Sequence, residues 1–246
     1  MAAAKAIEID DSLAEPHVTM AFIHLWFDWD WAGAEREAKR AIELNSNLAF
    51  AHIVHAQFLT AQERHTEALA EAAHARQLDP VSPIINTLQA ISQFSASRND
   101  EALASLQRAL ELSPNRWVAH LFRGAIYLEK RDYAEALAAF SKARDFSGRL
   151  GGQLHDRLHL GTGGRFDESA RAAGGMAILA CAALRSTSEC RHGSSRPERA
   201  RRVFRLAGEG YEDQDVGLCL LRVDRRWDAV RSDPRFQSIL KRMRLD

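Results

Sequence analysis

Two histidines have the spacing of a zinc-binding pair in the segment His155-Asp156-Arg157-Leu158-His159. On a helix, side chains four residues apart share one face, which is the geometry of the HExxH zinc motif. Aspartate replaces the glutamate that activates water in that motif, and a third ligand is not evident in the sequence. We therefore interpret both histidines as surface residues and predict no metal site.

A glycine-rich turn and three cysteines also have residue types that could do chemistry. Gly161-Thr162-Gly163-Gly164 could cradle a phosphate, but no strand precedes it and no Gly-Lys-Ser or Gly-Lys-Thr follows, so we interpret it as a turn. Cys181, Cys190 and Cys219 are odd in number and lack CxxC spacing, which argues against a disulfide framework or a zinc module. Neither Cys181 nor Cys190 has a His/Asn arrangement to activate a thiolate. We predict no cofactor, no small-molecule substrate and no enzymatic activity.

A basic run near residue 200 could contact nucleic acid. It consists of Arg196, Arg201, Arg202 and Arg205, with Glu198, Glu209 and Glu212 interleaved. No aromatic platform accompanies it, and the chain as a whole has equal numbers of basic and acidic residues, 33 each. A solvated helix face explains this pattern better than a nucleic-acid interface. We predict no direct contact with nucleic acid.

The sequence has no wholly apolar run of about 18 residues, the length that a transmembrane helix needs. Its first residues lack the basic start and apolar centre of a signal peptide. We therefore predict no membrane contact in this chain and a cytoplasmic location, with a periplasmic one if the chain is part of a longer membrane-anchored protein.

The helices of this chain are predicted from a sequence repeat. The sequence Ala-Ile-Glu-Ile-Asp begins at Ala6 and returns in related form 34 or 35 residues apart, at Ala41, Ala75, Ala109 and Ala143. A second alanine keeps the same step, at Ala34, Ala68, Ala102 and Ala136. A fixed period of this length predicts a stack of small units that each pack on their neighbours.

The fourth unit shows how each repeat is built. Residues 117–128 predict a first helix, 129–132 a turn and 133–146 a second helix. Small residues, here Gly124 and Ala136, recur where the two helices should cross, because they let the helix axes approach closely. His52 and His55, near the start of the second unit's first helix, could contact a ligand or a metal, but their framework positions favour ordinary packing.

The small residue at position eight, the aromatic residue at position eleven and the alanines at positions twenty and twenty-seven are present in unit four as Gly124, Tyr127, Ala136 and Ala143. This pattern resembles the tetratricopeptide repeat. The resemblance implies an all-α, right-handed α-solenoid of antiparallel helix pairs that binds protein or peptide partners. Unit one departs from the pattern, with Phe22 at the small position, which predicts an atypical or relocated crossing.

We predict four domains along the chain. They are a half repeat at 1–10, four repeats at 11–146, a degenerate fifth unit with a Gly/Ser/Arg-rich irregular segment at 147–196, and a helical cap at 197–246. Three explanations stay open for 147–205: a frame-shifted reading, a disordered insert or a divergent repeat. The half repeat favours a fragment of a longer protein over a frayed end.

Three segments carry a narrower resemblance. Residues 27–35, 211–218 and 223–236 look like parts of the C-terminal repeat regions of bacterial signalling proteins: winged-helix transcriptional regulators, nucleotide cyclases and serine/threonine kinases. The resemblance implies a sensory or assembly arm. The alternative is a fragment of a transcriptional regulator whose DNA-binding domain is missing. In the last segment, Asp233-Pro234 predicts the start of a helix that closes the stack with an apolar face.

In repeats of this kind, the first helix of each unit lines the concave groove at its second, fifth, ninth and twelfth positions. These positions are Pro16, Thr19, Ile23 and Trp26; Phe50, Ile53, Gln57 and Thr60; Ile84, Thr87, Ile91 and Phe94; and Val118, Leu121, Ala125 and Leu128. The set lacks the lysines and asparagines of members that clamp a terminal carboxylate. It predicts an apolar or helical ligand, which could be a flanking segment of the chain itself. Alternatively, part of this surface is buried between tightly wound units.

Overall fold

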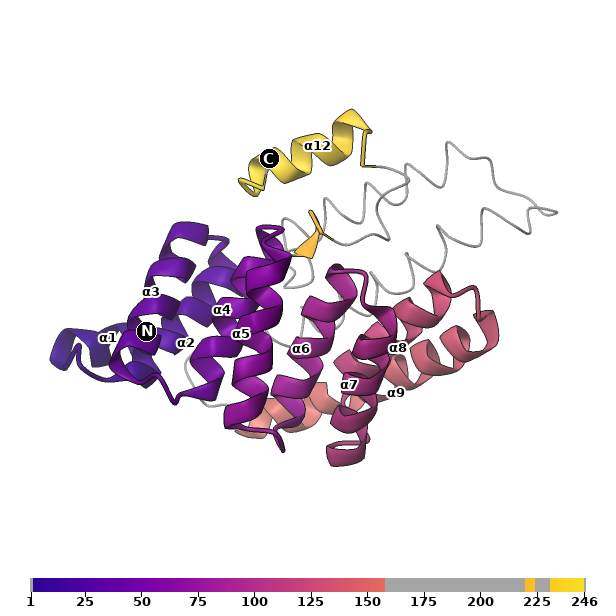
Figure 1. The fold of residues 1–246 in the computed structure, drawn as a ribbon, viewed down its shortest axis with the longest axis horizontal. Helices are drawn as coiled ribbons and strands as arrows, with labels where there is room; N and C mark the ends of the chain where they lie inside the picture. Colours follow the sequence, from indigo (N-terminus) through magenta and orange to yellow (C-terminus); the bar gives the residue numbers. More distant parts are fainter. Residues whose placement is uncertain (1, 158–219, 224–230, 246) are drawn as a thin grey trace.

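The computed structural model describes residues 2–157, 220–223 and 231–245, and in these ranges every regular element is a helix. The helices are α1 (Ala2–Ile9), α2 (Ala14–Ile23), η1 (His24–Asp28), α3 (Trp31–Leu44), α4 (Ala49–Ala61), α5 (His65–Leu78), α6 (Pro83–Ser95), α7 (Asn99–Leu112), α8 (Trp117–Glu129), α9 (Tyr133–Arg157) and α12 (Pro234–Arg242). They are arranged as successive helix pairs along one direction (Figure 1). The predicted all-α solenoid is confirmed.

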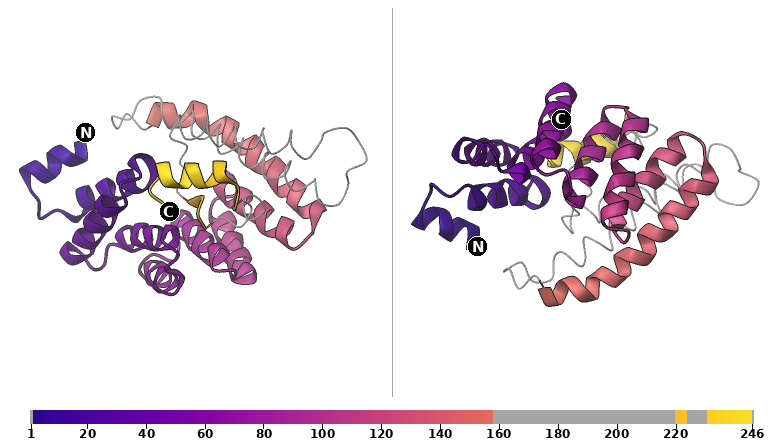
Figure 2. Two further views of the ribbon diagram at one scale, coloured as in Figure 1. Left: turned by 90° about the horizontal axis from the view of Figure 1, so that it is seen from above. Right: turned by 60° about the horizontal axis from the view of Figure 1, so that its bottom comes forward.

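Each repeat is a pair of neighbouring helices: α2 with α3, α4 with α5, α6 with α7 and α8 with α9. The first helices of successive pairs also contact one another, so α2, α4, α6 and α8 form a continuous row. This row follows the inside of the curve that the pairs describe (Figure 2). We call its surface the inner face.

Alanine and glycine set the spacing within the pairs. Ala34, Ala68 and Ala102 are 1% exposed or less, because each lies where two helices cross. In the last pair Ala136, 2% exposed, takes this position on α9. Gly124 is the small crossing residue on α8, and a Cβ atom there would lie 2.7 Å from two ring carbons of Phe140. The periodic small residues therefore determine how closely the helices approach.

The first helices end in a common turn. Glu63, Ser97 and Arg131 have positive φ angles of 62°, 64° and 62° and are 34 residues apart. Around Glu63, the amide of Arg64 donates to the carbonyl of Leu59 at 2.9 Å, the longer bond of a Schellman motif. This turn directs the chain into the second helix of each pair.

Unit one contains one extra residue. His17, His52 and His120 occupy the same place in their units, but the left-handed residue that ends the helix follows His17 by one more step, at Trp29. η1 accommodates the extra residue, because its π-type turn is one residue longer than an α-turn. Ala21, fully buried, is therefore the small crossing residue of this unit. The sequence pattern places the small position at Phe22, one residue C-terminal to the crossing residue in the structure.

The last repeat helix is longer than predicted. α9 continues through Gly148 to Arg157, past the expected end at Phe146. His155 lies in this helix, whereas His159 lies outside the described residues. The predicted fifth unit beyond 157, the glycine turn, the three cysteines and the basic run also lie outside them and stay predictions.

α12 begins as predicted at Asp233-Pro234. The Asp233 side chain accepts a hydrogen bond from the amide of Arg235, and Pro234 occupies the first turn. Its buried residues are Phe236, Ile239 and Leu240, with Met243 just after the helix. The predicted apolar face is confirmed.

Candidate peptide-binding face

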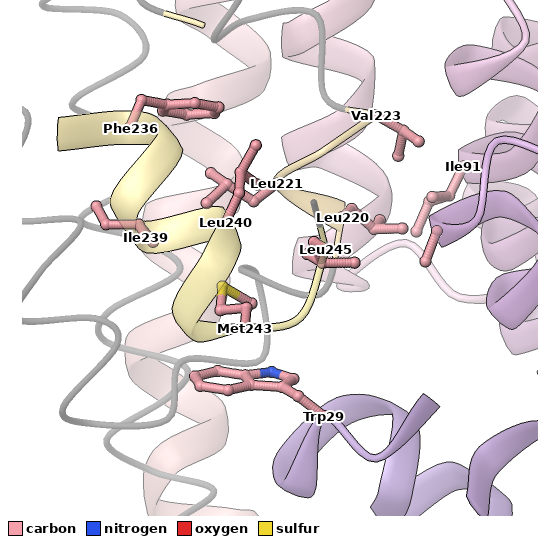
Figure 3. Packing of buried hydrophobic residues seen from close by; sticks show 11 residues of the cluster. Trp29, Ile91, Leu220, Leu221, Val223, Phe236, Ile239, Leu240, Met243 and Leu245 are labelled. Carbon is pink, nitrogen blue, oxygen red and sulfur yellow. The ribbon is translucent and has the colours of Figure 1, made fainter. Parts of the chain in front are cut away.

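The C-terminal segment of the chain packs on the inner face. We use this name for residues 220–223 and 231–245. One buried cluster joins it to the repeats, and Figure 3 shows Trp29 beside Met243 and Ile91 beside Val223. From the segment the cluster contains Leu220, Leu221, Val223, Phe236, Ile239, Leu240, Met243 and Leu245; from the repeats it contains Trp29, Ala61 and Ile91, with Trp26, Trp31, Leu88, Val118 and Phe122 partly buried around it.

α12 presents two different faces. Phe236, Ile239 and Leu240 are 6% exposed or less, whereas Arg235 and Lys241 are exposed. Burial of a large apolar side chain contributes about 1.5–3 kcal/mol to the free energy of folding. The apolar face therefore provides most of the free energy that holds this helix in place.

The end of α12 is fixed by main-chain contacts. Arg244 has a φ of 56°, and the amide of Leu245 donates to the carbonyl of Leu240 at 2.9 Å, which completes a Schellman turn. The turn returns Leu245 to the apolar cluster. The indole Nε1 of Trp31 donates to the carbonyl oxygen of Met243 at 2.8 Å. Such terminal carbonyls lack an intrahelical partner, so this donor satisfies a free group at the helix end.

An ion pair also joins the C-terminal segment to the turn after α4. Arg222 Nε lies 3.4 Å from Glu63 Oε1, and the two side chains are 31% and 48% exposed. An ion pair in contact with water to this extent contributes little to stability. Apolar contacts therefore dominate the association of the segment with the repeats.

Three of the predicted groove residues contact the C-terminal segment's cluster. Ile91 on α6 is 1% exposed and is part of the cluster, and Trp26 and Val118 pack against it. They come from the first, third and fourth repeats, which the segment thus connects.

A second group of predicted groove residues is buried between helices of the repeats. Ile53, Phe94, Leu121 and Ala125 belong to the clusters inside and between the pairs. Gln57 and Thr60 join α4 to α6, since both hydrogen-bond to the Ser92 hydroxyl, at 3.1 and 2.8 Å. In this conformation these side chains stabilise the stack and have little surface to offer a ligand.

The other predicted positions lie elsewhere on the first helices. Thr19 and Thr87 donate to carbonyls of their own helices, at 2.8 and 2.6 Å, and Ile84 is 41% exposed. Pro16, Ile23, Phe50 and Leu128 are half-buried. The extra residue in unit one also moves the positions equivalent to Pro16, Thr19 and Ile23 back by one residue. Peptide binding by the whole predicted set stays a prediction.

Five residues of the repeats that belong to the cluster or pack against it were absent from the predicted set: Trp29, Trp31, Ala61, Leu88 and Phe122. Trp29, Trp31 and Ala61 lie at or beyond the ends of first helices, because α12 crosses the inner face at that end. A count of positions within the helices does not reach them. Two tryptophans within a turn, in the Trp-Asp-Trp sequence at 29–31, are the signal that could have identified Trp29 and Trp31.

The repeats contain a regular buried histidine. His52 Nδ1 lies 2.7 Å from Glu71 Oε2, and its Nε2 lies 2.9 Å from the carbonyl oxygen of Ser46. His17 makes the same two contacts with Glu37 and Asp11. In each case the ring joins the incoming loop to the second helix of its own repeat. His52 therefore has a packing role, as its framework position indicated.

The fourth repeat retains half of this arrangement. His120 Nε2 lies 2.9 Å from the carbonyl oxygen of Pro114, but Ala139 occupies the place of the glutamate. Burial, followed by the Lys142 and Arg123 charges, lowers the pKa of His120, although its bond to Pro114 opposes this. By contrast, the neighbouring imidazoles of His55 and His52 lower the pKa of Glu71 to about 2. For Glu71, His52 at 2.7 Å is the closer partner, since His55 Nδ1 is 3.7 Å away.

Among the described side chains, no group of three His, Cys, Asp or Glu residues is arranged to hold a metal ion. None of the described helices is both long and apolar enough to cross a membrane.

The tetratricopeptide repeat family model matches residues 87–149. The DnaJ homolog subfamily C member 3 homolog of Dictyostelium discoideum is 27% identical over 153 residues; the match covers 60% of this chain and 29% of that protein. The chain thus spans less than a third of this relative.

Solved structures share the fold. The Cut9–Hcn1 hetero-tetramer of the APC/C matches with a TM-score of 0.58 at 13% identity, over 98% of this chain and 44% of that chain. YrrB, a TPR protein with an unusual peptide-binding site, matches with a TM-score of 0.47 at 18% identity, over 90% of this chain and 96% of that chain. At 13% identity, the likeness to the Cut9–Hcn1 chain extends to the fold alone.

Proposed function

We propose that this chain is a non-enzymatic protein-interaction module that binds an apolar protein or peptide segment through its inner face. One observation supports this most directly: the inner face already holds a peptide segment, the chain's own, by apolar contacts. A surface that buries one amphipathic helix has the chemistry to bind another.

The module could belong to a signalling protein. From the resemblance of residues 27–35, 211–218 and 223–236 to bacterial signalling proteins, we propose a sensory or assembly arm for an effector on the same or another chain. A transcriptional effector remains the alternative. If the chain contacted DNA directly, its affinity for DNA would fall steeply as the salt concentration rises. Its affinity for an apolar peptide would change little with salt.

Val118→Glu tests the inner face. Val118 is half-buried against the cluster, so a carboxylate there should repel an apolar ligand without entering the interior of the repeats. Leu137→Glu is the matched control, because Leu137 is 48% exposed on α9 and lies outside the cluster.

Proteins captured by the full chain would be purified and their affinities measured with pure components. We expect wild type and Leu137→Glu to bind the same protein, and Val118→Glu to bind it at least tenfold more weakly with unchanged helicity by circular dichroism. Equal binding by wild type and both variants would contradict the proposal.

A further inference from the structure

The bound C-terminal segment shows what kind of ligand the inner face accepts. Phe236, Ile239, Leu240 and Met243 occupy positions i, i+3, i+4 and i+7, so they form one stripe along a helix. All four are 6% exposed or less. The surface therefore selects an amphipathic helix and not an extended peptide, whose alternate residues would face opposite sides.

The inner face also recognises the end of the helix. The Trp31 indole donates to the carbonyl of Met243, which every helix could offer at its C-terminal end, whatever the side chain. Trp29 packs against the same turn (Figure 3). The two tryptophans thus form a docking place for the last turns of a helix.

The contacts of the segment can be replaced by those of another helix. They are mainly apolar and so not directional, and the polar contacts include a main-chain carbonyl and the partly exposed Arg222–Glu63 pair. The segment is also separated in sequence from α9 by residues 158–219. Covalent attachment makes it a local competitor for any incoming helix.

We propose that the inner face binds the last turns of an amphipathic helix from another protein, and that the chain's own C-terminal segment is the intramolecular competitor of that partner. This inference rests on the proposed function and adds the ligand class and its control. The partner helix carries large apolar residues with the spacing of Phe236, Ile239, Leu240 and Met243, and binds when α12 leaves.

The test uses the full chain and a fluorescein-labelled synthetic peptide of residues 231–246 as the probe. Ile239→Glu in the chain places a carboxylate in the apolar face of α12 and should release that helix. Ser238→Glu adds the same charge at the exposed neighbouring residue and should not. We expect Ile239→Glu to bind the peptide at least tenfold more tightly than wild type and Ser238→Glu, by fluorescence polarisation.

Two further variants keep the test decisive. Met243→Ala weakens docking of α12 without burying a charge, and we expect intermediate peptide affinity if Ile239→Glu proves unfolded. Trp31→Ala in the released chain should abolish peptide binding, because it removes the indole donor and its apolar surface. Release itself should shift tryptophan emission to longer wavelength, as Trp29 and Trp31 enter water.

The outcomes separate the inference from the proposed function. Equal peptide affinity in wild type, Ser238→Glu and Ile239→Glu would overturn the intramolecular competition and leave the binding module intact. Absence of binding to a folded, released chain would overturn both. A wild-type dimer in sedimentation that exchanges α12 between copies would assign the face to a second copy and overturn the partner helix.

Discussion

The buried histidines of the first two repeats each connect two parts of the backbone through one ring. His52 bridges the loop before α4, at Ser46, to Glu71 on α5. We expect His52→Ala to lower the free energy of unfolding by about 1–3 kcal/mol, because the carboxylate of Glu71 and the carbonyl of Ser46 lose the ring that satisfies them. His120→Ala should cost less, since His120 has the loop contact and lacks the glutamate. Urea denaturation measures both; an equal loss would contradict the role given to Glu71.

Glu71 makes the same repeat sensitive to acid. Its pKa is lowered from 4.5 to about 2 in the folded chain, by the neighbouring imidazoles of His55 and His52. The stabilisation from the ionised carboxylate is therefore complete above pH 4.5 and is lost as the pH falls toward 2. Glu71→Gln should flatten the fall of the melting temperature over this range, whereas Glu43→Gln, at an exposed position on α3, should leave it unchanged. A wild-type slope in Glu71→Gln would be the contrary result.

Arg131 has a backbone conformation that favours glycine. Its φ of 62° is in the left-handed region, which costs a residue with a Cβ atom about 1–2 kcal/mol. We expect Arg131→Gly to raise the free energy of unfolding by roughly 0.5–1 kcal/mol, after the greater chain entropy of glycine is subtracted. Ala134→Gly, three residues later in α9, should instead lower it by a similar amount. Thermal melts of the two variants should shift in opposite directions.

At the scale of the elements, close helix contact depends on the small crossing residues. A methyl group at Gly124 would lie 2.7 Å from the Phe140 ring, inside contact distance. We expect Gly124→Ala to lower the free energy of unfolding by about 1–3 kcal/mol through overpacking of α8 against α9. Phe140→Leu, which removes the ring, should reduce that penalty in the double variant. A double-mutant cycle with no coupling between the two positions would show that the helices separate freely.

Most of the elements follow from periodicity, because every full repeat places the same residue types at the same crossing. The turn at Asp233-Pro234 and the apolar stripe of α12 were equally readable, since capping and helical spacing are local properties. The π-turn of η1 was not: a constant period hides one extra residue, and it moved the crossing from Phe22 to Ala21. The docking of α12 depends on contacts between residues distant in sequence, such as Trp31 and Met243, which repeat positions alone do not specify.

At the scale of the whole molecule, the C-terminal segment changes how the repeats depend on one another. In an open solenoid each repeat contacts its neighbours, so unfolding can begin at an end and proceed by steps. Here the segment connects the first repeat, through Trp29 and Trp31, to Ile91 and Val118 in the third and fourth. The first repeat therefore gains stability from residues at the far end of the chain.

This connection predicts a loss of cooperativity when α12 is released. Leu240→Glu, which buries a carboxylate in the cluster, should broaden the calorimetric transition and reduce hydrogen-exchange protection in α2 and α3 first, because the first repeat loses its distant contacts. Lys241→Glu, exposed on the same helix, should melt as wild type does. If Leu240→Glu instead kept one sharp transition with uniform protection along the repeats, the stack would be cooperative through its neighbour contacts alone, and the segment would be a ligand of the inner face without being part of its stability.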